Sequence, residues 1–210
     1  MAEKKKVIST VKDTDLIKKR REQMIRASIE LFKQKGFHQT TTREIAKQSG
    51  FSIGTLYEYI RTKEDILFLV CDSVYELVHS RLAVALNREE PPVEKLMNVV
   101  ELYFHIMDEM QEEVLILYQE VKSLKNESKN YIIQKELDMV SMLTKLIKCT
   151  NPQKVSDGDV EIIANNVFVQ GQMWGFRRWA IQRNFTLEQY IAKQVKYLKR
   201  ALLINDGSES

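Results

Sequence analysis

The sequence predicts an all-α protein of about nine helices, and three observations carry that prediction. Its 210 residues include only 7 Gly and 3 Pro, too few for the many turns of a β-barrel or β-sandwich. Hydrophobic residues make up 44% of the chain, which is enough for a sizeable core, and they recur at helical spacing. The breaks in that spacing are short and contain Asn, Pro or Gly. We therefore expect long helices joined by short loops.

The start of the chain carries the clearest helix boundaries. The first expected helix spans about residues 15–35, because apolar side chains recur there on one face. Gly36 follows a Lys-rich last turn, the usual place for a residue of positive φ. Thr41 and Glu44 then predict a capping box at the start of a second, short helix, which Gly50 ends. The remaining helices are expected at about 52–59, 63–87, 93–110, 112–123, 127–149, 158–183 and 186–204.

The net charge of +3 conceals an asymmetry along the chain. Residues 1–66 carry 15 Lys and Arg against 9 Asp and Glu, whereas residues 67–210 carry 17 against 20. Residues 1–66 are therefore basic and the rest of the chain is mildly acidic, which indicates that only residues 1–66 bind a polyanion. We expect a mobile basic arm over 1–14, a DNA-binding domain over 15–66, and a ligand-binding and dimerisation domain over 67–210. The Lys4–Lys6 run is either a solvated tail or an arm for the minor groove.

Residues 41–59 place two short helices around Gly50, which predicts a helix-turn-helix. In that motif the second helix enters the major groove of DNA, and its first residues meet base edges. Hydroxyl and ammonium groups nearby are suited to phosphate contacts. The expected base-reading residues are Ser52, Ile53, Gly54 and Thr55. The expected phosphate-binding residues are Arg43, Lys47, Tyr57, Tyr59 and Lys63. The alternative is a helical hairpin with a solvated basic face.

This block, Arg21–Leu67, resembles the TetR family of one-component bacterial regulators. The resemblance rests on Leu31-Phe32, Gly36-Phe37, Thr41-Thr42, Ile45-Ala46, Gly50, Gly54-Thr55-Leu56-Tyr57, Tyr59 and Lys63-Glu64. It implies phosphate contacts from Thr42, Tyr57, Tyr59 and Lys63, and base-facing side chains at Arg43, Ser52, Ile53 and Thr55. Ile60 departs from the Phe that is common in the family. The resemblance further implies a transcriptional repressor that binds a palindromic double-stranded operator.

The resemblance also implies a homodimer, in which the last two helices of each subunit form a four-helix bundle. Gly171 and Gly175 lie on one helix face and permit close approach of another helix. An apolar stripe follows on the last expected helix, and pairing of identical faces is the commonest oligomer geometry. The expected interface residues are Gly171, Gly175, Ile191, Val195, Leu198 and Leu202.

A small-molecule pocket in the second domain is likewise implied by the resemblance. Met and aromatic residues gather between 97 and 179, and Met lines adaptable apolar sites. Residues 115–124 and the region around Arg177 are similar to family members that respond to acyl-CoA thioesters. The expected effector is therefore an acyl-CoA or another apolar molecule, with a role in fatty acid metabolism. The expected lining residues are Tyr103, Phe104, Met107, Tyr118, Phe168, Met173, Trp174, Arg177 and Arg178. The alternative is that these Met and aromatic residues form ordinary core and the two arginines a surface pair.

Other function classes find little support in the sequence. It contains no Gly-rich phosphate loop and no nucleophile elbow, so we expect neither an enzyme nor a cofactor. His38, His79 and His105 lie on separate elements, which predicts no metal site. Cys71 lies on an apolar stripe, where a buried thiol is favoured over a redox switch.

The sequence also predicts the compartment of the protein. The first residues are charged but no apolar run follows them, so we expect no signal peptide. The longest uncharged stretch, Ile162–Phe176, is too short to span a bilayer, which predicts a cytoplasmic protein with no membrane partner.

The alternative function is that of a ligand-blind architectural DNA binder or an adaptor controlled by a protein partner. A filled core around residues 96–107 and 163–179 would favour it.

Overall fold

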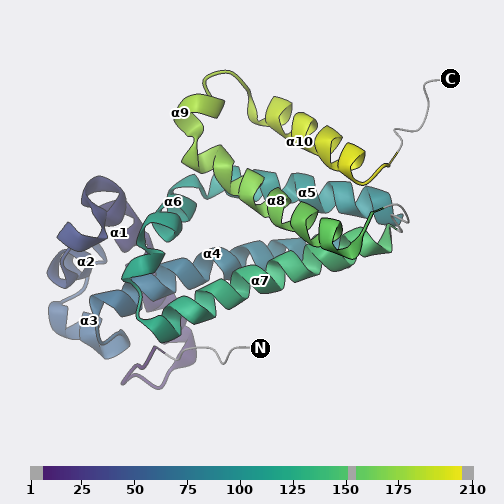
Figure 1. Cartoon of the computed structure of the whole chain (residues 1–210). Coiled ribbons are helices and arrows are strands. Elements are labelled where there is room, and N and C mark those ends of the chain that lie inside the picture. Colours follow the sequence, from purple (N-terminus) through teal and green to yellow (C-terminus); the bar gives the residue numbers. More distant parts are fainter. Residues whose placement is uncertain (1–6, 151–154, 205–210) are drawn as a thin grey trace. The chain divides into compact units, whose positions relative to one another are not determined.

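The computed structural model describes residues 7–150 and 155–204, and within these ranges the chain contains helices and no strand (Figure 1). This confirms the all-α prediction, with ten α-helices in the described part of the chain where about nine are expected. The helices are α1 (Thr14–Gln39), α2 (Thr42–Gln48), α3 (Ile53–Tyr59), α4 (Lys63–Leu86), α5 (Pro92–Glu109), α6 (Gln111–Glu120), α7 (Asn126–Cys149), α8 (Asp157–Phe176), α9 (Arg178–Ile181) and α10 (Leu187–Ala201), with a 3-10 turn η1 at Val121–Ser123. None of the helices in these ranges combines the length and the apolar character that crossing a bilayer requires.

Local signals in the sequence place several helix ends correctly. The Thr41 hydroxyl accepts a hydrogen bond from the backbone N–H of Glu44, and the Glu44 carboxylate accepts one from the backbone N–H of Thr41. The predicted capping box therefore starts α2. Gly36 has a φ of 79° and Gly50 a φ of 75°, values that residues with a Cβ rarely adopt. Gly36 thus kinks α1 three residues before its end, and Gly50 lets the chain turn sharply after α2.

The single helix expected over 158–183 is wrong, because α8 ends at Phe176 and α9 begins after Arg177. Arg177 has φ −106° and ψ 24°, outside the helical range. The Gln182 side chain donates to the Trp174 carbonyl at 3.1 Å and to the Gln111 side chain at 2.9 Å. This tertiary contact satisfies a carbonyl that the end of α8 leaves without a helical partner. No local sequence signal marks the break.

The chain divides into two compact units. Unit 1 comprises Met1–Tyr75 and Glu112–Gln134, and unit 2 comprises Glu76–Gln111 and Lys135–Ser210. The divisions fall inside α4, after the first residue of α6 and inside α7, rather than in linkers. The expected functional boundary at residue 66 therefore does not coincide with a boundary of compactness, and it stays a prediction about function.

Unit 1 contains α1, α2 and α3, which surround a core of fully buried side chains including Met24, Ile45 and Leu56. The first half of α4 contributes Ile66 to the same unit, and Cys71 is fully buried there. Burial raises the pKa of the Cys71 thiol to about 12, with a further contribution from nearby acidic groups. Cys71 is thus an inert, packed thiol, in agreement with the sequence expectation.

Unit 2 is built around α5, which contacts both α8 and α10 (Figure 1). The aromatic rings of Phe104, Trp174 and Tyr190 join these three helices. The Tyr190 ring centre lies 5.7 Å from that of Phe104 and 5.2 Å from that of Trp174. The Tyr190 hydroxyl also donates to the Gln170 carbonyl at 2.8 Å. This cluster fixes α10 on the surface formed by α5 and α8.

Candidate nucleic-acid interface and apolar cavity

Helices α2 and α3 form the predicted helix-turn-helix. Ile45, Ala46 and Leu56 are buried between them and α1, which holds the two short helices together. Gly50 turns the chain, and the backbone N–H of Phe51 donates to the Ala46 carbonyl at 2.8 Å. The pair therefore has a packed inner side and leaves its other side to solvent.

The start of α3 is exposed and made of small or apolar residues. Ser52 is the N-cap, and its hydroxyl accepts from the Thr55 backbone N–H at 3.0 Å. The Ser52 and Thr55 hydroxyls also lie 3.0 Å apart. Ile53 is 37% exposed, and Gly54 is exposed beside it. This surface allows close approach of a partner, offering two hydroxyls and one aliphatic side chain for contact with base edges.

Two further hydroxyls join α2 to α3 at the same surface. The Thr42 hydroxyl lies 3.1 Å from the Tyr57 hydroxyl, and the Tyr57 side chain is 47% exposed. Either oxygen can act as the donor within this pair, which leaves donor capacity for an outside acceptor. The geometry brings together the two hydroxyls that the sequence assigns to phosphate.

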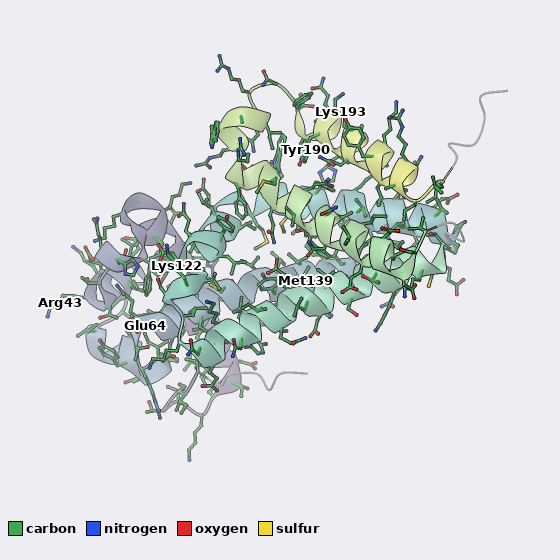
Figure 2. The ribbon with its side chains drawn as sticks, viewed as in Figure 1. Arg43, Glu64, Lys122, Met139, Tyr190 and Lys193 are labelled. Carbon is green, nitrogen blue, oxygen red and sulfur yellow. The ribbon has the colours of Figure 1, made fainter. Side chains whose placement is uncertain are left out.

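Arg43 and Lys47 supply positive charge on α2. Both are exposed, and neither makes an ion pair with any other residue in the described ranges. Figure 2 shows the Arg43 side chain extending away from the ribbon. Their neighbour Glu44, by contrast, is engaged by Lys35. These two cations are therefore available to an anionic partner.

Two of the expected phosphate ligands, Lys63 and Tyr59, make contacts within unit 1, and their role at phosphate stays a prediction. The Lys63 ammonium donates to the carbonyls of Phe37, His38 and Thr40 at 2.9, 3.2 and 3.0 Å, which uses all three of its protons. It also lies 4.3 Å from the centre of the Phe37 ring. Tyr59 is only 4% exposed and belongs to the core of unit 1.

Unit 2 encloses a small apolar cavity of about 10 Å³, which is the space of roughly one water molecule. Tyr103 and Phe168 line it, as the sequence predicts for an effector site. The Tyr103 hydroxyl donates to the Phe168 carbonyl at 3.1 Å, and their ring centres lie 4.8 Å apart. The remaining lining residues, which the sequence analysis missed because they read as ordinary core, are Leu82, Val99, Val100, Met142, Leu143 and Val167.

The other expected effector residues lie away from this cavity. Phe104 and Met107 are buried core residues, and Met173 is half-buried. The Trp174 indole N–H donates to the Asp108 carboxylate at 2.6 Å, a contact with no advance signal in the sequence.

Three expected effector residues are exposed. Tyr118 is 65% exposed and belongs to unit 1. Arg177 and Arg178 are both exposed, and the Arg177 guanidinium lies 4.8 Å from the centre of the Trp179 ring. Of the nine expected residues, the structure therefore brings only Tyr103 and Phe168 to the cavity.

The glycines expected at the dimer interface lie close to residues of the same chain, and their place in an interface stays a prediction. A Cβ on Gly171 would lie 2.3 Å from a Tyr103 ring carbon, and one on Gly175 would lie 3.6 Å from Gln111. Close approach therefore occurs within unit 2. The apolar stripe of α10 is also largely used there, with Ile191, Leu198 and Leu202 buried and Val195 half-buried.

Comparison with known sequences identifies the family. The sequence model for bacterial regulatory proteins of the tetR family matches residues 24–70, which include α2 and α3. The model for the tetracyclin repressor-like C-terminal domain matches residues 89–179, and together the two cover more than half of the chain. The chain belongs to the TetR family. It is a DNA-binding transcriptional regulator of the helix-turn-helix type.

Relatives of this TetR-family protein are regulators as well. The HTH-type transcriptional regulator HbdR of Aromatoleum sp. (strain CIB) is 27% identical over 208 residues, 99% of this chain and 91% of that protein. The fatty acid metabolism regulator protein of Bacillus subtilis (strain 168) is 32% identical over 85 residues, 40% of this chain and 44% of that protein. The crystal structure of AibR in complex with isovaleryl coenzyme A and operator DNA has a TM-score of 0.71 at 20% identity, over 85% of this chain and 97% of that one. The last comparison shows the shared fold.

Proposed function

We propose that this regulator is a cytoplasmic, ligand-responsive repressor that binds a palindromic double-stranded operator as a homodimer. The observation that carries the proposal is the exposed surface of α2 and the start of α3. It combines two exposed cations, which form no ion pair with another described residue, with four hydroxyls beside an exposed Ile53 and Gly54. This is the side of the helix-turn-helix that its core packing leaves open to a partner.

Each part of this surface has a distinct role in the proposal. The start of α3 enters the major groove and reads base edges, while the hydroxyls and cations around it hold the phosphates. The base-reading residues are Ser52, Ile53, Gly54 and Thr55. The phosphate-binding residues are Thr42, Arg43, Lys47 and Tyr57.

The dimer is proposed to form through the outer face of α8 together with α10. Ile162 is 60% exposed and Val169 is 42% exposed, although both are aliphatic. They are seven residues apart and thus lie two turns apart on one helix face. Tyr197, 53% exposed, adds an aromatic side chain from α10. In an isologous contact this face would pack against the same face of a second copy of the chain.

The proposed effector is an acyl-CoA thioester whose apolar acyl part enters the cavity of unit 2. The AibR complex with isovaleryl coenzyme A supports this ligand class, and the B. subtilis relative supports a role in fatty acid metabolism. The cavity of about 10 Å³ is too small for an acyl group as it stands, and a core filled to this degree favours the ligand-blind alternative unless binding displaces a lining side chain. Tyr103 is the obvious candidate, because it lines the cavity and packs on Gly171. A ligand that binds only the displaced arrangement shifts the population of conformations, which is how it would release DNA.

A binding experiment separates this proposal from the ligand-blind alternative. A duplex selected by the protein from a randomised library is bound first, and acyl-CoA thioesters of increasing chain length are then added. We expect release of the duplex by a thioester of matching length and none by free coenzyme A. Retention of the duplex at saturating concentrations of every thioester would favour the ligand-blind architectural binder or the partner-controlled adaptor.

A further inference from the structure

The segment before α1 is docked on unit 1. Residues 1–14 are expected to form a mobile arm, but residues 7–13 have defined contacts, and residues 1–6 lie outside the described part of the chain. Val7 is only 7% exposed, whereas its neighbour Ile8 is 49% exposed. One side of the segment is therefore inserted into the protein and the other faces solvent. Residues 7–13 therefore have a defined place on unit 1, and the mobility of the arm stays a prediction.

The segment is docked at the carboxyl end of the proposed recognition helix α3 (Figure 1). The Glu58 carbonyl accepts from the Ser9 hydroxyl at 2.8 Å and from the Thr10 backbone N–H at 2.9 Å. The next carbonyl, that of Tyr59, accepts from the Arg21 guanidinium at 3.1 Å. These are carbonyls that the end of a helix leaves without helical partners.

Arg21 joins the segment to the helix. The same terminal nitrogen that donates to Tyr59 also donates to the Val7 carbonyl. Burial lowers the pKa of Arg21, and the charge of Asp65 opposes that shift. The Asp65 carboxylate itself accepts from the backbone N–H groups of Arg61 and Thr62 at the start of α4. Arg21 thus lies where the N-terminal segment, the end of α3 and the start of α4 meet.

Helix α3 depends on such contacts more than a longer helix would. It has only 7 residues, and its C-cap Ile60 is neither Gly nor Asn and has extended backbone angles. Helices this short are marginal without tertiary contacts, and no Schellman or left-handed cap ends this one. The partners of its last two carbonyls are instead residues that lie 38 and 49 positions earlier in the chain.

We propose that Val7, Ser9, Thr10 and Arg21 form a clamp, here named the α3 clamp, that positions the recognition helix for base readout. The inference rests on the proposed DNA-binding role of α3. Because the clamp holds the end of α3 that lies away from the bases, its residues act through the helix and are positioning residues. Loss of the clamp frees α3 to tilt, which weakens contacts with specific bases. Phosphate contacts from Arg43 and Lys47 on α2 are unchanged by it.

Matched substitutions test the clamp in the full chain. Val7→Asn places an amide in a buried position, and Ile8→Asn makes the same type of change on the exposed side. Arg21→Met removes the guanidinium, and Lys19→Met removes an exposed positive charge from the same helix. All four variants keep the lysines of residues 4–6, so nonspecific attraction from that run is retained.

The readout is the ratio of two affinities for each variant. One is for a duplex that the wild-type protein selects from a randomised library, and the other is for a duplex of unrelated sequence at the same salt concentration. We expect Arg21→Met to lower this ratio about tenfold, which is the effect of losing a hydrogen bond from a charged group. Val7→Asn should lower the ratio by a similar factor, because the amide disfavours burial of the segment that carries Ser9 and Thr10. Ile8→Asn and Lys19→Met should leave the ratio within about twofold of wild type.

The outcomes are distinguishable. An unchanged ratio in the clamp variants would overturn the clamp. A merely structural role lowers only the folded fraction, which reduces both affinities by the same factor. If Arg21→Met does not fold, Ser9→Ala removes one clamp hydrogen bond and should still lower the ratio, whereas an unchanged ratio in folded Ser9→Ala would count against the clamp. If the wild-type protein selects no sequence at all, the proposed DNA-binding function fails instead.

Discussion

At the scale of single residues, two lysines near the DNA-binding surface have opposite environments. The Lys63 ammonium donates to three backbone carbonyls and lies over the Phe37 ring. The Lys47 ammonium is on the exposed side of α2. One lysine therefore holds the end of α1 to the start of α4, and the other is free to bind phosphate.

These environments predict opposite effects of the same substitution. Lys63→Met should lower the free energy of unfolding by about 1–3 kcal/mol, because it removes a charged donor from three carbonyls. Lys47→Met should change stability by less than about 0.5 kcal/mol but weaken DNA binding several-fold. Denaturant unfolding and duplex titration of both variants measure the two quantities. Full stability combined with lost DNA binding in Lys63→Met would return that lysine to the phosphate-binding set.

Gly171 provides a second test at this scale. A Cβ there would overlap the Tyr103 ring, so Gly171→Ala should destabilise the protein by about 1–3 kcal/mol through overpacking. A Cβ on Gly158, near the start of the same helix, would meet only open space, and Gly158→Ala should be neutral or stabilising by up to about 1 kcal/mol. Denaturant unfolding compares the two variants. Equal stability of both would show that Tyr103 moves aside freely.

At the scale of elements, the capping box of α2 makes the stability of the helix-turn-helix depend on pH. The Glu44 pKa is lowered from its ordinary value of 4.5 to about 2, chiefly by the hydrogen bond from Lys35 and then by those from Thr41. Because the folded state prefers the ionised carboxylate, its contribution is fully present above the ordinary pKa. It is lost as the pH falls from about 4.5 through about 2.

Glu44→Gln should therefore destabilise the protein at neutral pH, and the difference from wild type should shrink as the pH falls through this window. Denaturant unfolding of both proteins across the acid range measures the difference. A difference that is constant with pH would show that the charge of Glu44 contributes nothing to the cap.

The outer face of α8 makes a prediction about assembly. Ile162→Glu should convert dimer to monomer, because it places two like charges across an isologous contact. The matched control is Val84→Glu on α4, where the valine is 65% exposed, close to the 60% of Ile162. Sedimentation velocity at several concentrations reports the assembly state. A dimer that persists in Ile162→Glu but dissociates in Val84→Glu would move the interface to α4.

The features of these elements that sequence reasoning predicts are those with local causes. The Thr41–Glu44 box and the positive φ of Gly36 follow from neighbours within a few positions. Other features depend on tertiary contacts, for which the sequence has no periodic or capping signal. These are the hydrogen bonds from Lys63 to backbone carbonyls and the hydrogen bond from Gln182 to the Trp174 carbonyl near the end of α8. The docked segment at α3 belongs to the same class. This is why the ends of α2 follow from the sequence, whereas the contacts of Lys63 and the docking of residues 7–13 do not.

At the scale of the whole molecule, the charge asymmetry of the chain matches the division of labour that we propose. The first 66 residues, with 15 basic against 9 acidic residues, contain the surface of α2 and α3. The remainder, with 17 against 20, contains the apolar cavity and the outer face of α8. This distribution of charge favours nonspecific attraction of DNA to the first 66 residues.

The central claim is that a dimer of this protein reads DNA sequence through the start of α3. Selection of duplexes from a randomised library by the wild-type protein, followed by sequencing, tests it most directly. We predict an inverted repeat whose half-site centres lie roughly 34–36 Å apart or somewhat more, as two symmetry-related recognition helices require, with altered half-sites when Thr55→Ala and Ile53→Ala are selected in parallel. A single unrepeated site, or recovered sequences without a consensus, would contradict the account.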